Sequence, residues 1–257
     1  MVRASRKDAF VDSLPILVAV AGAYVLAGFV KGVIGMGLPT VAIGVLGLMM
    51  TPAQAAAILV VPSLVSNIWQ FAVGGGLAVL LRRLWPLLIG ICIGTFLGAV
   101  LLPNGSSGNA TIWLGIALAV YAALGLIKVH FSVPPRAEIW LGLVVGIATG
   151  AITVATGIFA LPNVPYIQAL NMERDKLVQA LGLSFTVSTV TLALALQHAG
   201  EINASLVGPS LVALGAALAG LWLGQLVRGR IQPATFQLFF FLGMLGLGTH
   251  LALRGLL

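Results

Sequence analysis

Charged residues are scarce in this sequence. Asp, Glu, Lys and Arg make up only 7% of its 257 residues, whereas soluble domains carry roughly 25%. So few charges do not cover a water-facing surface, which excludes a soluble globular protein. Hydrophobic residues instead make up 60% of the chain, and its mean hydropathy is +1.13. The composition therefore predicts an integral membrane protein whose solvent is lipid.

Cysteine and histidine are nearly absent too. The single cysteine, Cys92, excludes an intramolecular disulfide and any cysteine-based metal cluster. The three histidines are scattered at positions 130, 198 and 250, and the sequence has neither an H-E-x-x-H nor a G-x-S-x-G motif. We therefore expect no enzymatic activity, no cofactor and no bound metal.

Acidic residues are outnumbered by basic ones. The chain has 13 Lys and Arg against 6 Asp and Glu. In a soluble protein this excess would suggest nucleic acid, but no basic stripe with interleaved aromatic residues is present. The basic residues fall mostly at the ends of apolar runs, where they indicate orientation and contacts with lipid phosphates. No Asp or Glu lies in the middle of a run, so we do not expect a proton relay of buried carboxylates.

Long apolar runs predict the membrane-crossing helices, since a crossing needs about 20 apolar residues. The runs cover approximately 14–50, 53–73, 84–102, 110–129, 139–170, 177–196, 204–227 and 234–253. The first and the fifth are too long for one crossing and are interrupted by glycine and proline. Each of them is followed by three uninterrupted runs, so the order of segments repeats.

Matching residues support this duplication. At a constant separation of 123 residues, four identities align: Pro39 with Pro162, Met49 with Met172, Ala57 with Ala180, and Pro86 with Pro209. The proline-rich segment around 134–135 is the best internal boundary. We predict one membrane domain made of two transmembrane repeats, residues 1–130 and residues 131–257.

Loop charges indicate that the two repeats are inverted. Arg82 and Arg83 mark one loop of the first repeat, while the corresponding loop at 198–201 has no Lys or Arg; the next loop reverses this, being uncharged at 103–109 but basic at 228–230. Lys and Arg favour the cytoplasmic side. Corresponding loops therefore lie on opposite faces, as in an inverted repeat.

Inversion requires an odd number of crossings in each repeat, so each interrupted stretch has to cross twice. The alternative is a re-entrant loop, which gives eight crossings and parallel repeats. We predict an all-α integral membrane protein with two inverted repeats, each built from one interrupted helix stretch (broken or re-entrant) and three spans, and about 8 to 10 transmembrane helices in all.

The first interruption is a candidate anion site that contains Gly35, Gly37 and Pro39. Backbone outside a helix persists at membrane depth only where it is buried in protein or lines a polar cavity. A helix that starts near Pro39 would direct free N–H groups and the positive end of its dipole into the protein, where an anion can bind.

The second interruption supplies the matching candidates Thr153, Thr156, Gly157 and Pro162. The two threonines offer hydroxyl groups in otherwise apolar surroundings. The alternative reading is that the glycines of both interruptions allow tight helix packing and that the threonines bond to their own helix. For the glycines at positions 90, 94 and 98 we expect packing alone.

Further polar residues lie on the following runs. Ser63, Asn67 and Gln70 are spaced to share one helical face and to line a polar path; interhelical hydrogen bonding is the alternative. Ser184 lies on the corresponding run of the second repeat. Lys31 is the only charge inside the first interrupted stretch, and we predict that it is the counter-charge for an anion, unless it snorkels to the interface.

Short motifs resemble a known family. The run GFVKGVIGMGLP at 28–39, followed by MTPAQA at 50–55, resembles the first repeat of the sulfite exporter TauE/SafE family. Residues 143–162 and 180–184 resemble its second repeat. The resemblance implies a multi-pass transporter of the cell inner membrane that exports sulfite, sulfoacetate or a related organosulfur anion, and it allows a homodimer.

By position, the resemblance implies that the breaks before Pro39 and Pro162 flank the substrate path and that Gln54 starts the next span. The second repeat departs from the pattern, since Ile-Phe-Ala at 158–160 replaces Gly-Met-Gly at 35–37. We therefore expect the second break to be displaced toward 150–157. The resulting hypothesis is alternating access around both breaks near the bilayer midplane, with a channel-like facilitator and a non-transporting scaffold as alternatives.

Overall fold

The computed structural model describes residues 14–72, 75–101, 109–127 and 132–256, and over these residues every regular element is a helix. The α-helices are α2 (Leu14–Ile34), α3 (Leu38–Leu46), α4 (Pro52–Ala72), α5 (Leu77–Leu101), α6 (Ala110–Ile127), α7 (Glu138–Thr156), α8 (Asn163–Ala169), α9 (Arg174–His198), α10 (Val207–Val227) and α11 (Pro233–Leu256). A 3-10 turn, η1 (Ala204–Leu206), leads into α10. This confirms the predicted all-α fold.

Eight of the described helices are long and apolar enough to cross a membrane. The two others, α3 and α8, have nine and seven residues. At about 1.5 Å per residue they are far shorter than the roughly 30 Å of a hydrocarbon core. These short helices follow the two interruptions that the sequence predicts.

The outer surface of the bundle is apolar. All five tryptophans are exposed, from 48% for Trp85 to 69% for Trp69, together with many Leu, Ile, Val and Phe side chains. Water-soluble monomers rarely expose large contiguous apolar patches. A lipid environment accounts for this surface.

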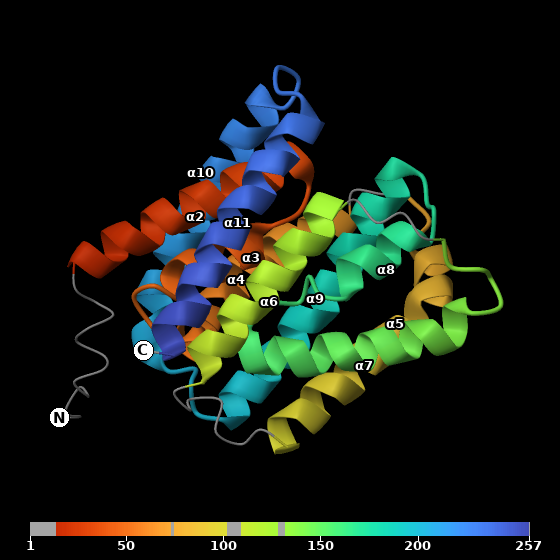
Figure 1. Cartoon of the computed structure of the whole chain (residues 1–257), viewed down its shortest axis with the longest axis horizontal. Coiled ribbons are helices and arrows are strands. Elements are labelled where there is room, and N and C mark those ends of the chain that lie inside the picture. Colours follow the sequence, from red (N-terminus) through yellow and green to blue (C-terminus); the bar gives the residue numbers. More distant parts are fainter. Residues whose placement is uncertain (1–13, 73–74, 102–108, 128–131, 257) are drawn as a thin grey trace.

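Glycines bring two pairs of helices into backbone contact. A methyl group at Gly28 would overlap the carbonyl of Ala217, where α2 crosses α10; one at Gly94 would overlap Ile147, where α5 crosses α7. Gly90 and Gly98 lie on the same α5–α7 contact, so the packing role expected for these glycines is confirmed. Figure 1 shows α2 with α10 on one side of the molecule and α5 with α7 on the other.

The helix contacts have an internal symmetry. Helix α2 of the first repeat corresponds to α7 of the second, and α5 corresponds to α10. The α2–α10 contact therefore has a counterpart in the α7–α5 contact, and both contacts are present. Equivalent helices also pack on each other: α4 on α9, and α6 on α11. Both of these pairs are antiparallel. Between α4 and α9, Ser63 lies beside Thr189 while Phe71 lies beside Gln179. Between α6 and α11, Gly125 lies beside Phe241 while Ile112 lies beside Gly255. Antiparallel equivalents are what an inverted repeat requires.

Both interrupted stretches run out and back through the bundle. In the first, Gly35 lies beside Gln70 at the end of α4, whereas Thr51 precedes the start of α4; the segment 35–51 therefore returns along the length of α4. In the second, Tyr166 near the end of α8 donates to the carbonyl of Glu138 at the start of α7. Each repeat thus traverses the bundle five times, the odd number that inversion needs.

The breaks are shorter than the sequence indicates. Helix α2 continues through Gly32 to Ile34, and α7 continues through Gly150 to Thr156. Gly150 packs on α5 and Gly32 on α10, because a side chain at either position would collide with the neighbouring backbone. The expected displacement of the second break toward 150–157 is therefore wrong except at its last residue. The predicted boundary at residue 130 lies outside the described residues and stays a prediction.

Candidate functional site

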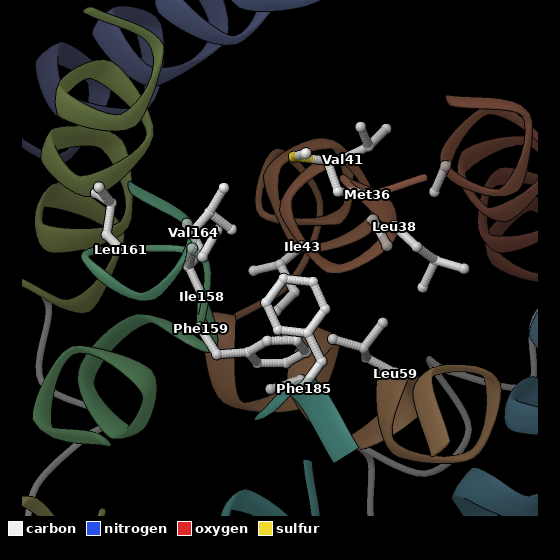
Figure 2. Close-up of a cluster of buried hydrophobic side chains, with 14 of the residues drawn as sticks. Met36, Leu38, Val41, Ile43, Leu59, Ile158, Phe159, Leu161, Val164 and Phe185 are labelled. Atoms are coloured by element: carbon white, nitrogen blue, oxygen red, sulfur yellow. The ribbon is translucent and has the colours of Figure 1, made fainter. Parts of the chain in front are cut away.

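The two breaks lie at opposite ends of α4, because Gly35 lies beside Gln70 whereas Gly157 lies beside Ala56. The second break packs against α3 and α9. Figure 2 shows Phe159 of the second break pointing toward Ile43 of α3 and Phe185 of α9. The rings of Phe159 and Phe185 are 5.1 Å apart between centroids, and a methyl group at Gly157 would lie 2.6 Å from the Ile43 side chain. Ile43, Ile158 and Phe159 are completely buried. The contact of the second break with α3 and α9 is thus apolar.

Two glycines make the first break. Gly35 has φ +82° and Gly37 has φ +103°, a left-handed conformation that is costly for other residues. Gly37 precedes α3, and Pro39 occupies its first turn, where the missing N–H costs nothing. Thr40 in the same turn is 1% exposed, and its hydroxyl has no hydrogen-bond partner in the described structure.

The threonines of the second break hold the end of α7. Thr153 donates to the carbonyl of Thr149 (2.7 Å) and Thr156 to the carbonyl of Ile152 (2.7 Å), so both bond to their own helix as the alternative reading proposed. Thr156 also accepts the backbone N–H of Ile158. Gly157, with φ +77°, ends the helix. The hydrogen bonds of the two threonines and the left-handed conformation of Gly157 therefore determine where α7 ends.

Asn163 is a buried polar residue that the sequence analysis missed. It directly follows Pro162, which precedes α8. Its amide nitrogen donates to Ser184 Oγ (3.1 Å) and to the carbonyl of Phe159 (3.3 Å), while its Oδ1 has no partner among the described residues. The separation of 123 residues that pairs Pro39 with Pro162 also pairs Thr40 with Asn163. That repeat offset was the signal available in the sequence.

Lys31 lies one turn before the first break and is 5% exposed. Its Nζ donates to Ser66 Oγ at 3.1 Å and to Asn67 Oδ1. Asn67 continues to Ser63 Oγ (3.0 Å), and Ser63 Oγ lies 3.1 Å from Thr189 Oγ1. We call these five residues the polar cluster. It joins α2 to α4 and crosses from the first repeat to the second.

Hydrogen bonds fix the donor direction through the polar cluster. Thr189 gives its hydroxyl hydrogen to the carbonyl of Phe185 (2.7 Å), so Ser63 has to donate to Thr189. Ser63 therefore accepts from the Asn67 amide nitrogen, which leaves Asn67 Oδ1 as an acceptor for Lys31. The donor chain runs in one direction, from Lys31 to the backbone carbonyl of Phe185, whose ring packs on Phe159 of the second break.

Gln70 ties the first break to α9. Its Nε2 donates to the carbonyl of Gly35 (3.1 Å) and to the carbonyl of Val178 (2.9 Å). Gln179 makes the reciprocal bond from α9 to the carbonyl of Phe71 (2.9 Å). The predicted shared face of α4 is therefore real, and it holds helices together at the break.

Gln54 lies far from the polar cluster. Its side chain accepts the backbone N–H of Thr51, and its own N–H bonds to the Thr51 hydroxyl, which is a capping box at the start of α4. At about 1.5 Å per residue, it lies roughly 20 Å along the helix from Asn67. The structure thus gives Gln54 a role in helix capping.

The arrangement combines one buried lysine with neutral hydrogen-bonding groups. Among the described residues, Lys31 has no carboxylate partner, and no group of His, Cys, Asp or Glu is placed to hold a metal. Thr40 adds a hydroxyl in the first turn of α3, where free N–H groups and the helix dipole favour negative charge. Chemically, these groups suit a small anion.

One comparison with known proteins gives a match. The family model described as sulfite exporter TauE/SafE matches residues 20–251, a range that contains both breaks and the whole polar cluster. No curated protein and no solved structure matches the chain.

Proposed function

The chain belongs to the sulfite exporter TauE/SafE family, and from this we propose that it is a secondary transporter that exports a small sulfur-containing anion across the cell inner membrane. The substrate is sulfite or a sulfonate such as sulfoacetate. The family and the eight apolar helices support a multi-pass transporter of small anions. The substrate and the mechanism are our proposal.

The burial of Lys31 is the observation on which the proposal rests. A basic residue buried at membrane depth is expensive and marks a functional path. Its described neighbours, Ser66 and Asn67, are neutral, so a bound anion would supply the missing negative charge. Substrate binding beside Lys31 also brings the anion within a turn of Gly35, at the break that leads into α3.

We propose alternating access because an apolar barrier lies in the centre of the bundle. The second break, α3 and α9 form an apolar plug of Ile43, Ile158, Phe159 and Phe185 (Figure 2). An anion does not pass such a plug unless α3 and α8 separate on one side at a time. The symmetry of the two repeats supplies two equivalent ways to open, one toward each face of the membrane.

Basic residues set the orientation that we propose. Arg82 and Arg83 lie in the second turn of α5, and Arg228 follows α10. Since α10 runs parallel to α2 and α5 starts where α4 ends, these residues belong to one end of the bundle. Lys and Arg favour the cytoplasmic side, so this end faces the cytoplasm. The homodimer stays a prediction.

Flux through proteoliposomes tests the proposed function. Purified protein is reconstituted, and uptake of sulfite, sulfoacetate, thiosulfate, sulfate and chloride is compared with uptake by protein-free liposomes and by the Lys31→Gln variant. We expect saturable flux of sulfite or sulfoacetate, with chloride excluded and the variant impaired. Flux that rises linearly with concentration would identify a channel-like facilitator, and absence of flux for all five anions would refute transport.

A further inference from the structure

The Lys31 amine has one bonding position left. A neutral amine has two N–H groups and one lone pair, while the ammonium form has three N–H groups. Two hydrogens are already used, because Ser66 and Asn67 both act as acceptors. Ser66 gives its own hydrogen to the carbonyl of Ser63, and the Asn67 amide nitrogen is committed to Ser63 Oγ. The third position on Nζ is therefore either a lone pair or an unpaired N–H.

No permanent negative charge faces this position in the described structure. The helices that pack chiefly on α2 are α10, α3 and α11, and Lys31 also reaches α4. Helix α9 lies beside Gly35, and its acidic residue, Asp175, is exposed. Helices α3, α4 and α10 have no titratable side chain. On α11, His250 is exposed and Arg254 binds the carbonyl of Leu48; on α2 itself the other titratable group is Tyr24, a phenol that is neutral at physiological pH.

An empty site therefore favours the neutral amine, and an occupied site favours the ammonium. A buried charge without a partner is strongly disfavoured, and the group releases its proton instead. A nearby anion reverses this preference. Protonation of Lys31 and binding of the anion are then linked, so each strengthens the other by the same factor.

We propose that Lys31 is the proton-coupling residue of this transporter, binding one proton with each anion and releasing both on the other side. This inference rests on the proposed function. On loading, a proton from water adds to the amine lone pair and the new N–H donates to the anion. On release, the anion leaves and the proton returns from Nζ to water. Net direction follows the summed gradients of anion and proton.

A pH gradient across proteoliposomes tests the coupling. Sulfoacetate is the probe because both of its acid groups are ionised near neutral pH, so its own titration does not mimic coupling. The voltage is held at zero with potassium and valinomycin, and the concentration of sulfoacetate starts equal on both sides. With the outside one pH unit more acidic, one proton per anion drives about tenfold accumulation inside.

Two variants separate coupling from transport. Arginine stays protonated in proteins, so Lys31→Arg should move sulfoacetate down its gradient without accumulation by the pH gradient. Asn67→Asp gives Lys31 a permanent counter-charge and should likewise abolish accumulation. The control is Thr249→Val, which changes an exposed threonine that bonds to its own helix and should accumulate like the wild type.

A binding measurement covers the case in which both variants are inactive. Adding sulfoacetate to the weakly buffered protein in detergent should take up about one proton per anion bound by the wild type, and none by Lys31→Gln at saturating anion. Undiminished accumulation by Lys31→Arg, or proton uptake by Lys31→Gln, would overturn the inference. Wild-type flux that ignores the pH gradient would also overturn it and leave the proposed function intact, whereas absence of any anion flux refutes the proposed function itself.

Discussion

Arg83 in α5 donates from Nη2 to the carbonyl oxygen of Leu170, the C-cap residue that follows α8, at a distance of 3.2 Å. Arg254 in α11 donates in the same way to the carbonyl of Leu48, just after α3, at 2.6 Å. Each repeat thus uses one arginine to hold the C-terminal end of the short helix of the other repeat, where positive charge is favoured by the helix dipole. Arg83 is further anchored by Glu138 at 2.6 Å.

These two arginines should control the two short helices independently. The Arg83→Gln variant removes the bond to Leu170 and the partly exposed ion pair with Glu138, together worth about 1 kcal/mol. We expect backbone hydrogen exchange in α8 to rise about fivefold, while exchange in α3 stays as in the wild type. Hydrogen–deuterium exchange with mass spectrometry measures both segments in one experiment.

The matched control for this prediction is Arg254→Gln. It should raise exchange in α3 and leave α8 unchanged. If either variant raises hydrogen exchange in α3 and α8 equally, or in neither helix, the two arginines do not stabilise the two short helices independently.

Glycine packing on α2 gives a second prediction. A side chain at Gly28 would overlap the backbone of α10, whereas Gly22, on the same helix, has open space around it. We expect Gly28→Ala to lower the apparent melting temperature in detergent, with a cost of about 1–3 kcal/mol from overpacking. Gly22→Ala should leave it unchanged or raise it, since alanine favours the helix by up to about 1 kcal/mol. Equal effects of the two substitutions would contradict the close α2–α10 contact.

The segments and breaks could be predicted from the sequence because they depend on local chemistry. Apolar runs mark the helices, and Gly35, Gly37 and Pro39 interrupt one of them wherever the helix lies. The repeat order and loop charges also predict inverted repeats, and the antiparallel packing of α4 on α9 is consistent with this prediction. Gly32 and Gly150 look the same in sequence but pack inside helices, because the role of a glycine depends on which helix lies against it.

The partners of the polar residues could not be predicted in this way. Lys31 and Asn67 are 36 residues apart, and nothing local indicates that they meet. Thr153 and Thr156 were expected to face substrate, but the nearest acceptors in lipid are carbonyls of their own helix. Asn163 was missed because its significance comes from its tertiary contact with Ser184.

Thr40 gives the sharpest test of the substrate site. Its buried hydroxyl has no partner in the described structure, so Thr40→Val removes no intramolecular bond and should leave the apparent melting temperature unchanged or slightly higher. If the hydroxyl contacts the anion, as its place in the first turn of α3 suggests, the KM for sulfite or sulfoacetate should rise about tenfold, the loss of about 1.4 kcal/mol. Saturation kinetics in proteoliposomes and thermal unfolding in detergent measure the two quantities separately.

Asn163→Leu is the informative comparison, because Asn163 occupies the matching position after the second break. Its amide nitrogen donates to Phe159 and Ser184, so this substitution should cost about 1–3 kcal/mol of stability in addition to any effect on KM. The pair thus separates binding from folding at equivalent positions. A wild-type KM for Thr40→Val would show that the Thr40 hydroxyl does not contact the substrate. Reduced stability of this variant would show that the hydroxyl has a structural partner.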